Sequence, residues 1–304
     1  MQYKNHLSGF REWDQEDHAD KWLLFENNIG ENLSIDEVDL SNGELYTVVT
    51  NKQAKGGKGA IVAMVEGTKS SEIAPILRKM AIEKRKEVKE ITLDMAGSMN
   101  LIAQNTFTNA TQVVDRFHVQ KIVSDAVQEI RVDYRKQTIK EENKKILEAR
   151  ECGKIYRPDT YENEDTKKQL LARSRYLLFK PESKWKNKQK IRAEILFREF
   201  PDLKNAYDLS MMFRSVYEHG KTIEDAKTRL DNWYKKVEEK NIESFDVAAE
   251  TIHLHETTIL NYFLNRSTNA SAESFNAKLK AFRSIVRGVR DRKFHLFRIA
   301  KLYA

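Results

Sequence analysis

The stretch ENLSIDEVDLSNGELYTVVTNKQAKGGKGAIVAMVEG, residues 31–67, decides the fold. Three short runs rich in β-branched and aliphatic residues lie within it, at 31–40, 45–51 and 59–67. Ser-Asn-Gly at 41–43 and Lys-Gly-Gly-Lys-Gly at 55–59 separate these runs, and glycine-rich segments of this kind are typical of turns. The pattern therefore predicts a three-stranded antiparallel meander.

The remaining elements of the sheet are predicted on the C-terminal side of this meander. A helix is expected from about Ser70, because Ser and Glu72 favour the first turn of a helix. The segment Val88–Met95 predicts a fourth strand, Ser98–Phe107 a short helix and Thr111–Phe117 a fifth strand. Three strands, a helix, a strand, a helix and a strand is the order of a ribonuclease H-like sheet. We therefore predict an α/β fold with a mixed five-stranded sheet.

The rest of the chain has a helical pattern. Eight of the eleven glycines lie in the first 97 residues, and from Val119 onward the sequence is polar and helical, with Trp185 and Trp233 spaced for burial. The predicted segments are an N-terminal helical lead-in (1–30), the first part of the ribonuclease H-like core (31–130), an all-helical insertion (131–255) and the C-terminal helices of the core (256–304).

Composition excludes several classes of protein. The single cysteine, Cys152, is incompatible with a disulfide framework and with a multi-cysteine zinc site. The N-terminus predicts no secretory signal, and no apolar run has the length of a membrane span. We therefore expect a cytoplasmic protein with no membrane partner.

Positive charge is concentrated at one end of the chain. The net charge is +7, and from Asn261 to Ala304 there are ten Lys or Arg residues and two acids. Clustered cations bind polyanions such as DNA because they displace phosphate counterions. A solvated helix face would have the same composition, so both interpretations stay open at this point.

Two acids stand at predicted strand positions. Asp36 shares one face of its strand with Val38 and Leu40, where a carboxylate is costly unless it is paired or metal-bound. Asp94 follows an apolar strand and precedes a Gly-Ser turn, a position at which α/β folds place active sites. For Asp36 the alternative is a solvated edge-strand acid, and for Asp94 it is a helix cap.

A third acid begins a polar stripe on a predicted late helix. Glu273, Asn276, Lys280, Arg283 and Arg287 recur at spacings of three or four residues. A carboxylate at the head of such a stripe suits a metal ligand, while the amide and the cations behind it suit DNA contacts. The alternative is a solvent-exposed face of Glu–Lys pairs.

Asp115 and His118 form a D-x-x-H motif at a predicted strand-to-helix junction. We expect these two residues to position the substrate or a ligand rather than to bind the metal directly. The alternative is that His118 is a local hydrogen-bond partner of Asp115.

Several segments together resemble bacterial insertion-sequence transposases of the ISL-three (ISL3) type, which are DDE transposases. They are SIDEV at 34–38, ITLDMAGSM at 91–99, VVDRFHVQK at 113–121, STNASAESFNAKLK at 267–280 and RSIVRGVRD at 283–291. The resemblance implies a ribonuclease H-like fold with a helical insertion, and the catalytic and metal-binding triad Asp36, Asp94 and Glu273. It leaves open whether Asp94 or Asp115 is the second ligand.

The resemblance also implies cofactors and partners. The expected cofactor is two Mg²⁺ ions, with Mn²⁺ as an alternative. The expected partner is double-stranded DNA, as transposon ends and as target, bound by a homo-oligomer in the bacterial nucleoid. Relatives usually begin with a cysteine-rich zinc segment and a helix-turn-helix. Because this chain begins close to the catalytic part, we expect a fragment, a degenerate copy or one half of a split transposase with a separate N-terminal DNA-recognition subunit.

Two other functions fit the same residues. One is a ribonuclease H-like nuclease or resolvase that cleaves DNA without strand transfer. The other is an inactive DNA-binding protein derived from a transposase.

Overall fold

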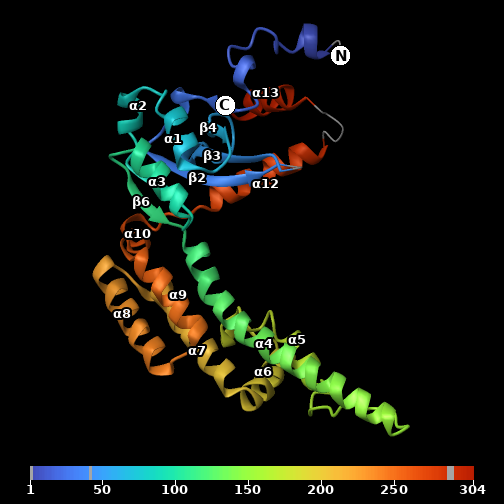
Figure 1. The fold of residues 1–304 in the computed structure, drawn as a ribbon. Coiled ribbons are helices and arrows are strands. Elements are labelled where there is room, and N and C mark those ends of the chain that lie inside the picture. Colours follow the sequence, from blue (N-terminus) through green and yellow to red (C-terminus); the bar gives the residue numbers. More distant parts are fainter. Residues whose placement is uncertain (1–2, 41–42, 286–290) are drawn as a thin grey trace. The chain divides into compact units, whose positions relative to one another are not determined.

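The chain divides into two compact units. The computed structural model describes residues 3–40, 43–285 and 291–304. One unit, here called the sheet unit, comprises Met1–His118 and Thr257–Ala304, and the other, the helical unit, comprises Val119–Glu256 (Figure 1). No described helix combines the length and the apolar character that crossing a membrane requires.

The sheet unit contains a mixed six-stranded sheet with the order β1-β4-β3-β2-β5-β6. The strands are β1 Trp22–Leu24, β2 Asn32–Asp39, β3 Leu45–Asn51, β4 Ile61–Glu66, β5 Glu90–Leu93 and β6 Thr111–Val114. The neighbouring pairs β1–β4, β4–β3 and β3–β2 are antiparallel, whereas the pairs β2–β5 and β5–β6 are parallel. The predicted meander is therefore confirmed, although residues 41 and 42 of its first turn lie outside the described residues.

The predicted number of five strands is wrong, and so is the helical lead-in over 1–30. The described part of that segment has only single turns, at Tyr3–Leu7, Glu16–His18 and Glu26–Asn28, together with β1. Leu23 of β1 is fully buried and pairs with Met64. Gln15 covers the open edge of β1, because its side chain both donates to and accepts from the backbone of Leu24, at 3.0 and 2.9 Å. A strand of three residues is too short to show a period of two, and this explains the error.

Two late helices cover one side of the sheet. They are α12, Ala270–Ile285, and α13, Arg292–Tyr303. Phe275 and Leu279 of α12 join Val38 of β2 in one buried apolar cluster. Burying each such side chain stabilises the fold by about 1.5–3 kcal/mol. This packing sets the position of α12 against β2.

Three early helices lie between the strands in sequence. They are α1 Ser70–Leu77, α2 Ile82–Lys86 and α3 Gly97–Thr106. α1 packs against α3 and β4, and α3 packs against β5. Every residue of β5 is buried, as expected of a strand covered on both faces.

The helical unit follows the strands in sequence, and its helices confirm the helical structure predicted for this part of the chain. Its helices are α4 Arg116–Glu151, which begins in the sheet unit, α5 Lys167–Arg173, α6 Asn187–Glu199, α7 Pro201–His219, α8 Ile223–Lys240 and α9 Glu243–Leu254. The chain then returns to the sheet unit through α10 Glu256–Leu260 and α11 Tyr262–Asn265. Trp233 and Trp185 are buried as predicted, and each indole N–H donates to a backbone carbonyl at 2.9 Å.

Candidate metal centre

Two aspartates lie side by side, Asp36 within β2 and Asp94 directly after the end of β5. Ser34 pairs with Thr92 in the parallel register of these strands. Continuing that register by two residues places Asp36 beside Asp94. Adjacent strands are about 4.8 Å apart, so the two carboxylates emerge from neighbouring backbones at the same level of the sheet.

A third aspartate continues the row on β6. Leu93 pairs with Val114, and the backbone N–H of Asp115 donates to the carbonyl of Leu93 at 2.9 Å. Asp115 therefore follows β6 where Asp94 follows β5. Three aspartates on three adjacent parallel strands therefore form a row at the level where β5 and β6 end, and α/β folds bind ligands beyond the carboxyl ends of parallel strands.

Asp36 is held in place by α12. Its Oδ2 accepts a hydrogen bond from Nδ2 of Asn276 at 2.8 Å, and its Oδ1 accepts from the backbone N–H of Glu37 at 2.8 Å. The same Asn276 nitrogen lies 3.3 Å from the carbonyl oxygen of Glu37. Asn276 is itself buried, so the amide links α12 to β2 at the level of the acids.

Several charged side chains surround Asp36 and affect its pKa. Burial raises the pKa of Asp36 above its usual value. The charges of Asp94 and Glu273 raise it further, whereas the backbone hydrogen bond and the charge of His118 lower it. Asp94, His118 and Glu273 are therefore close enough to Asp36 for their charges to affect it. We call Asp36, Asp94, Asp115, His118 and Glu273 the acidic centre.

The tightest group within the acidic centre is Asp115, His118 and Glu273. Each offers one ligand atom, and these atoms all lie within 4.8 Å of one another. Asp115 is buried after β6, His118 lies in the first turn of α4, and Glu273 is exposed in the first turn of α12. Two carboxylate oxygens and an imidazole nitrogen fit a divalent cation, and such a mixed set suits Mn²⁺ or Zn²⁺ better than Mg²⁺.

The predicted triad is less tightly gathered. Within the described residues, no group of three that includes Asp36 or Asp94 has its ligand atoms all within 4.8 Å of one another. Oδ1 of Asp94 instead accepts the backbone N–H of Ala96 at 2.8 Å. Metal binding by Asp36, Asp94 and Glu273 therefore stays a prediction, and the direct ligand role that we did not favour for Asp115 and His118 gains geometric support.

Two features of the centre were not recognised in the sequence. Glu37 has a raised pKa because of burial and of the charges of Asp94 and Asp36. Lys52 lies where β3 ends, with its Nζ 2.8 Å from Thr92 Oγ1. Burial lowers the pKa of Lys52, while Glu90 and Asp115 act in the opposite direction. Neither residue could be placed without knowing which strands are neighbours.

The side chains predicted to contact DNA have different environments. Asn276 donates to Asp36, and an Nη of Arg283 pairs with Glu44 at 3.1 Å. Lys280 is exposed on α12. Arg287 lies outside the described residues.

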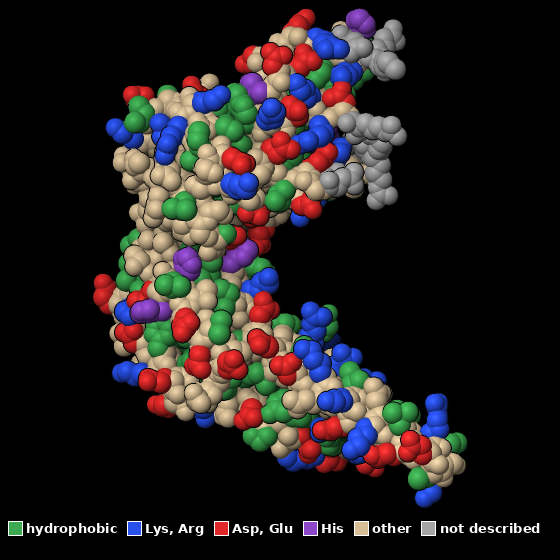
Figure 2. All heavy atoms as spheres, viewed as in Figure 1, with side chains coloured by type: hydrophobic (Ala, Val, Ile, Leu, Met, Phe, Trp, Pro, Cys, Tyr) green, Lys and Arg blue, Asp and Glu red, His purple; other side chains and the backbone are tan. Residues whose placement is uncertain are grey.

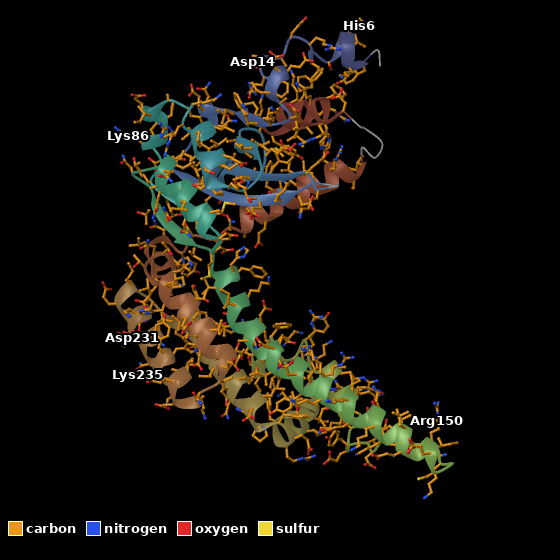
Figure 3. The ribbon with its side chains drawn as sticks, viewed as in Figure 1. His6, Asp14, Lys86, Arg150, Asp231 and Lys235 are labelled. Carbon is orange, nitrogen blue, oxygen red and sulfur yellow. The ribbon has the colours of Figure 1, made fainter. Side chains whose placement is uncertain are left out.

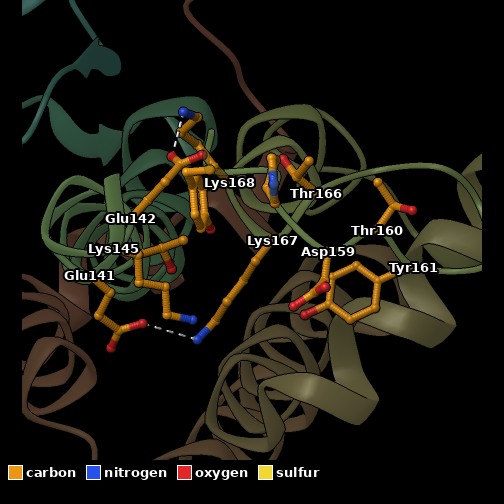
Figure 4. Close-up of a pocket in the computed structure, with 12 residues that line it drawn as sticks. Glu141, Glu142, Lys145, Asp159, Thr160, Tyr161, Thr166, Lys167 and Lys168 are labelled. Atoms are coloured by element: carbon orange, nitrogen blue, oxygen red, sulfur yellow. Dashed lines mark ion pairs between the residues drawn. The ribbon is translucent and has the colours of Figure 1, made fainter. Parts of the chain in front are cut away.

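Two acids that line a pocket of the helical unit are paired with lysines. A pocket of about 190 Å³ lies between the C-terminal half of α4 and the start of α5. Figure 4 shows two ion pairs at its wall, Glu141–Lys167 at 3.7 Å and Glu142–Lys168 at 2.5 Å. Because lysines already balance these acids, the pocket is a poor metal site.

Several charged side chains on the surface of the helical unit are also paired with opposite charges. Acidic and basic side chains are intermingled on the face of this unit that Figure 2 shows. Asp231, labelled on α8 in Figure 3, accepts from Lys227 one turn earlier at 2.6 Å. Ion pairs of this kind are typical of solvated helices.

A comparison with known protein families adds an independent finding. The model of the ISL3 family of DDE transposases, described as “Transposase”, matches residues 33–299. The match includes every residue of the acidic centre. Neither the curated proteins nor the solved structures gave a match to this chain.

Proposed function

The chain belongs to the ISL3 family of DDE transposases, and we propose that it cuts and joins DNA ends at the acidic centre. The observation that supports this most strongly is the row of Asp36, Asp94 and Asp115 on three adjacent parallel strands, with Glu273 of α12 beside it. Carboxylates repel one another in the absence of a cation. Their convergence from distant parts of the chain favours a metal-dependent site.

We propose that the sheet is ribonuclease H-like. A meander whose first strand is extended by two parallel strands supports this interpretation, with β1 as an additional edge strand. The helical unit interrupts the sheet unit in sequence, so we propose that it is the insertion expected before the catalytic glutamate.

The residues of the acidic centre have distinct proposed roles. Asp115, Glu273 and His118 would hold one divalent cation, and Asp36 and Asp94 would complete a site for a second. Such ions activate water and stabilise charge on a phosphodiester. Asn276 orients Asp36 through its hydrogen bond, so that the carboxylate does not have to reorganise during the reaction.

DNA contacts are proposed on α12. Lys280 is exposed and free to reach a phosphate, whereas Arg283 must leave Glu44 in order to do so. Arg287 remains a predicted phosphate contact. A homo-oligomer on DNA and a separate end-recognition subunit remain predictions as well.

The test uses DNA from both sides of the chain's own reading frame. Duplexes that carry these flanks are incubated with the protein and either Mg²⁺ or Mn²⁺. We expect metal-dependent nicks at the element ends. With ends cut in advance, we expect their 3′ hydroxyls to be joined to a supercoiled plasmid.

The two alternative functions give different products. A nuclease or resolvase would cleave but would not join the pre-cut ends. An inactive DNA-binding protein would bind the duplex without cleavage, and Glu273→Gln would then behave as the wild type does. Either result would contradict the proposal.

A further inference from the structure

Phe117 is an exposed aromatic residue next to the acidic centre. Phe117 is 58% exposed, whereas the other thirteen phenylalanines, all of which are described, are buried or partly buried. It lies between Asp115 and His118 in the sequence, in the first turn of α4. All three residues belong to the sheet unit.

The ring of Phe117 has little contact with the protein. Its ring centroid lies 5.7 Å from that of His118 at an interplanar angle of 85°, an edge-to-face contact. No other ring or cation contact of Phe117 occurs among the described residues. Val119 and Val123 on the same helix are buried, so Phe117 projects from a different side of α4. A phenylalanine exposed in this way loses part of the stabilisation of about 1.5–3 kcal/mol that full burial contributes.

We propose that Phe117 stacks on an unpaired nucleobase of the DNA end that enters the acidic centre. This inference rests on the proposed function. A phosphodiester that reaches Asp115, His118 and Glu273 brings its flanking bases to the residue between the first two. A base at a duplex end is the easiest to unpair, and an aromatic face offers it a replacement for the lost stacking.

The chemistry of Phe117 also determines which DNA it accepts. A phenyl ring has no hydrogen-bonding group, so it stacks on any base with little sequence preference. The expected ligand is therefore a single-stranded or frayed end of any sequence rather than a particular nucleotide.

The test compares three DNA probes. They are a blunt duplex, the same duplex with a single-stranded thymidine extension, and the same duplex with an abasic extension. Affinity is measured by fluorescence anisotropy in Ca²⁺. We expect the wild type to bind the thymidine extension more tightly than the abasic one, by about 5- to 150-fold, which corresponds to the stacking of one base.

Variants of Phe117 identify the source of that preference. Phe117→Ala is expected to lose it while still binding the blunt duplex, and Phe117→Trp is expected to keep it. Tyr176→Ala, which removes an exposed aromatic side chain from the helical unit, is the matched control and should change nothing. Thermal denaturation of each variant shows whether it is folded.

The outcomes separate this inference from the proposed function. If the wild type binds blunt duplex but does not prefer the thymidine extension, or if Phe117→Ala keeps the preference, Phe117 is not a stacking residue although the proposed function stands. If Phe117→Ala changes the oligomeric state and leaves the preference intact, the ring serves a protein contact and the inference fails. If the wild type binds no DNA, both the proposed function and the inference fail.

Discussion

Two aspartates, the fully buried Asp165 of the helical unit and the partly buried Asp36 of the sheet unit, have opposite surroundings. Asp165 of the helical unit is fully buried and is hydrogen-bonded by Arg173 and by Nε of Arg192, the latter at 2.7 Å. Burial alone would raise the pKa of Asp165, but the two arginines hold it below its usual value. Asp36 of the sheet unit has a raised pKa, because burial acts on it together with two other acids.

The difference shows how each unit compensates a carboxylate charge that is removed from water. The helical unit supplies its own cations, since removing an unbalanced buried charge from water is expensive. In the sheet unit, none of Asp36, Asp94, Asp115 and Glu273 forms an ion pair with a described lysine or arginine. The missing positive charge is therefore expected from a metal ion bound by this unit. Substitutions should then affect stability in the helical unit and activity in the sheet unit.

The largest effect is expected from Glu273→Gln. Loss of this carboxylate should reduce metal-dependent DNA cleavage by at least about a thousandfold, equivalent to about 4 kcal/mol. Because Glu273 is exposed, the free energy of unfolding should change by less than about 1 kcal/mol. Single-turnover cleavage and urea denaturation measure the two effects. Glu238→Gln, an exposed residue of α8, is the control and should retain full activity.

The next effect concerns stability. Asp165→Asn should lower the free energy of unfolding by about 3–5 kcal/mol, because Arg192 is left partly buried without its partner. Asp94→Asn keeps an oxygen for the N–H of Ala96 and removes a like charge from Asp36, so no comparable loss is expected. Urea denaturation of both variants checks this. Equal destabilisation by the two substitutions would remove the contrast between the units.

A smaller effect is expected at Asn276. Without its amide, Asp36 is oriented only by the N–H of Glu37. Asn276→Ala should raise the Mn²⁺ concentration needed for half-maximal cleavage by about 10- to 100-fold, which is typical for residues that orient ligands. The exposed Asn232→Ala of α8 is the control. A fall in maximal rate with no change in metal requirement would argue against a role in orienting Asp36.

The smallest effect, counted per pH unit, is a dependence of stability on pH that arises from His295. Burial, with Arg283 and Arg298 nearby, lowers the pKa of His295 from 6.5 to about 4. The unfolded chain therefore binds this proton between about pH 6.5 and 4 while the folded chain does not. Stability should fall with decreasing pH in that window, by less than about 1.4 kcal/mol per pH unit.

Removing the imidazole tests this dependence. Neither ring nitrogen of His295 has a hydrogen-bond partner within the described structure, so His295→Leu removes the titration without breaking a hydrogen bond. Urea denaturation from pH 7 to 4 should show a shallower fall for the variant. Identical slopes for the two proteins would show that His295 titrates normally.

Local sequence patterns located most of the fold. Alternation placed Asp36 on the same face as Val38, and both residues now meet α12. The boundaries between the strands of the meander were predicted from glycine-rich segments, because such segments favour turns over strands. The short strand β1 was missed because three residues cannot show a periodicity.

The composition of the acidic centre was harder to predict. Whether Asp94 or Asp115 lies closest to Glu273 depends on the offset between parallel strands, which the connecting helices determine and local pattern does not. The hydrogen bond from Asn276 to Asp36 joins residues 240 positions apart. The position of Asn276 in the polar stripe of α12 was compatible with a DNA contact. Only the packing of α12 on β2 shows that the amide of Asn276 faces inward.

Titration calorimetry with Mn²⁺ tests the central claim most directly. The wild type, the double variant Asp115→Asn with Glu273→Gln, and the control Asp39→Asn, an exposed acid at the end of β2, are compared without DNA. We expect the wild type and Asp39→Asn to bind Mn²⁺ with equal affinity and the double variant to lose that binding. Equal affinity in all three proteins, or no binding by the wild type, would contradict the account.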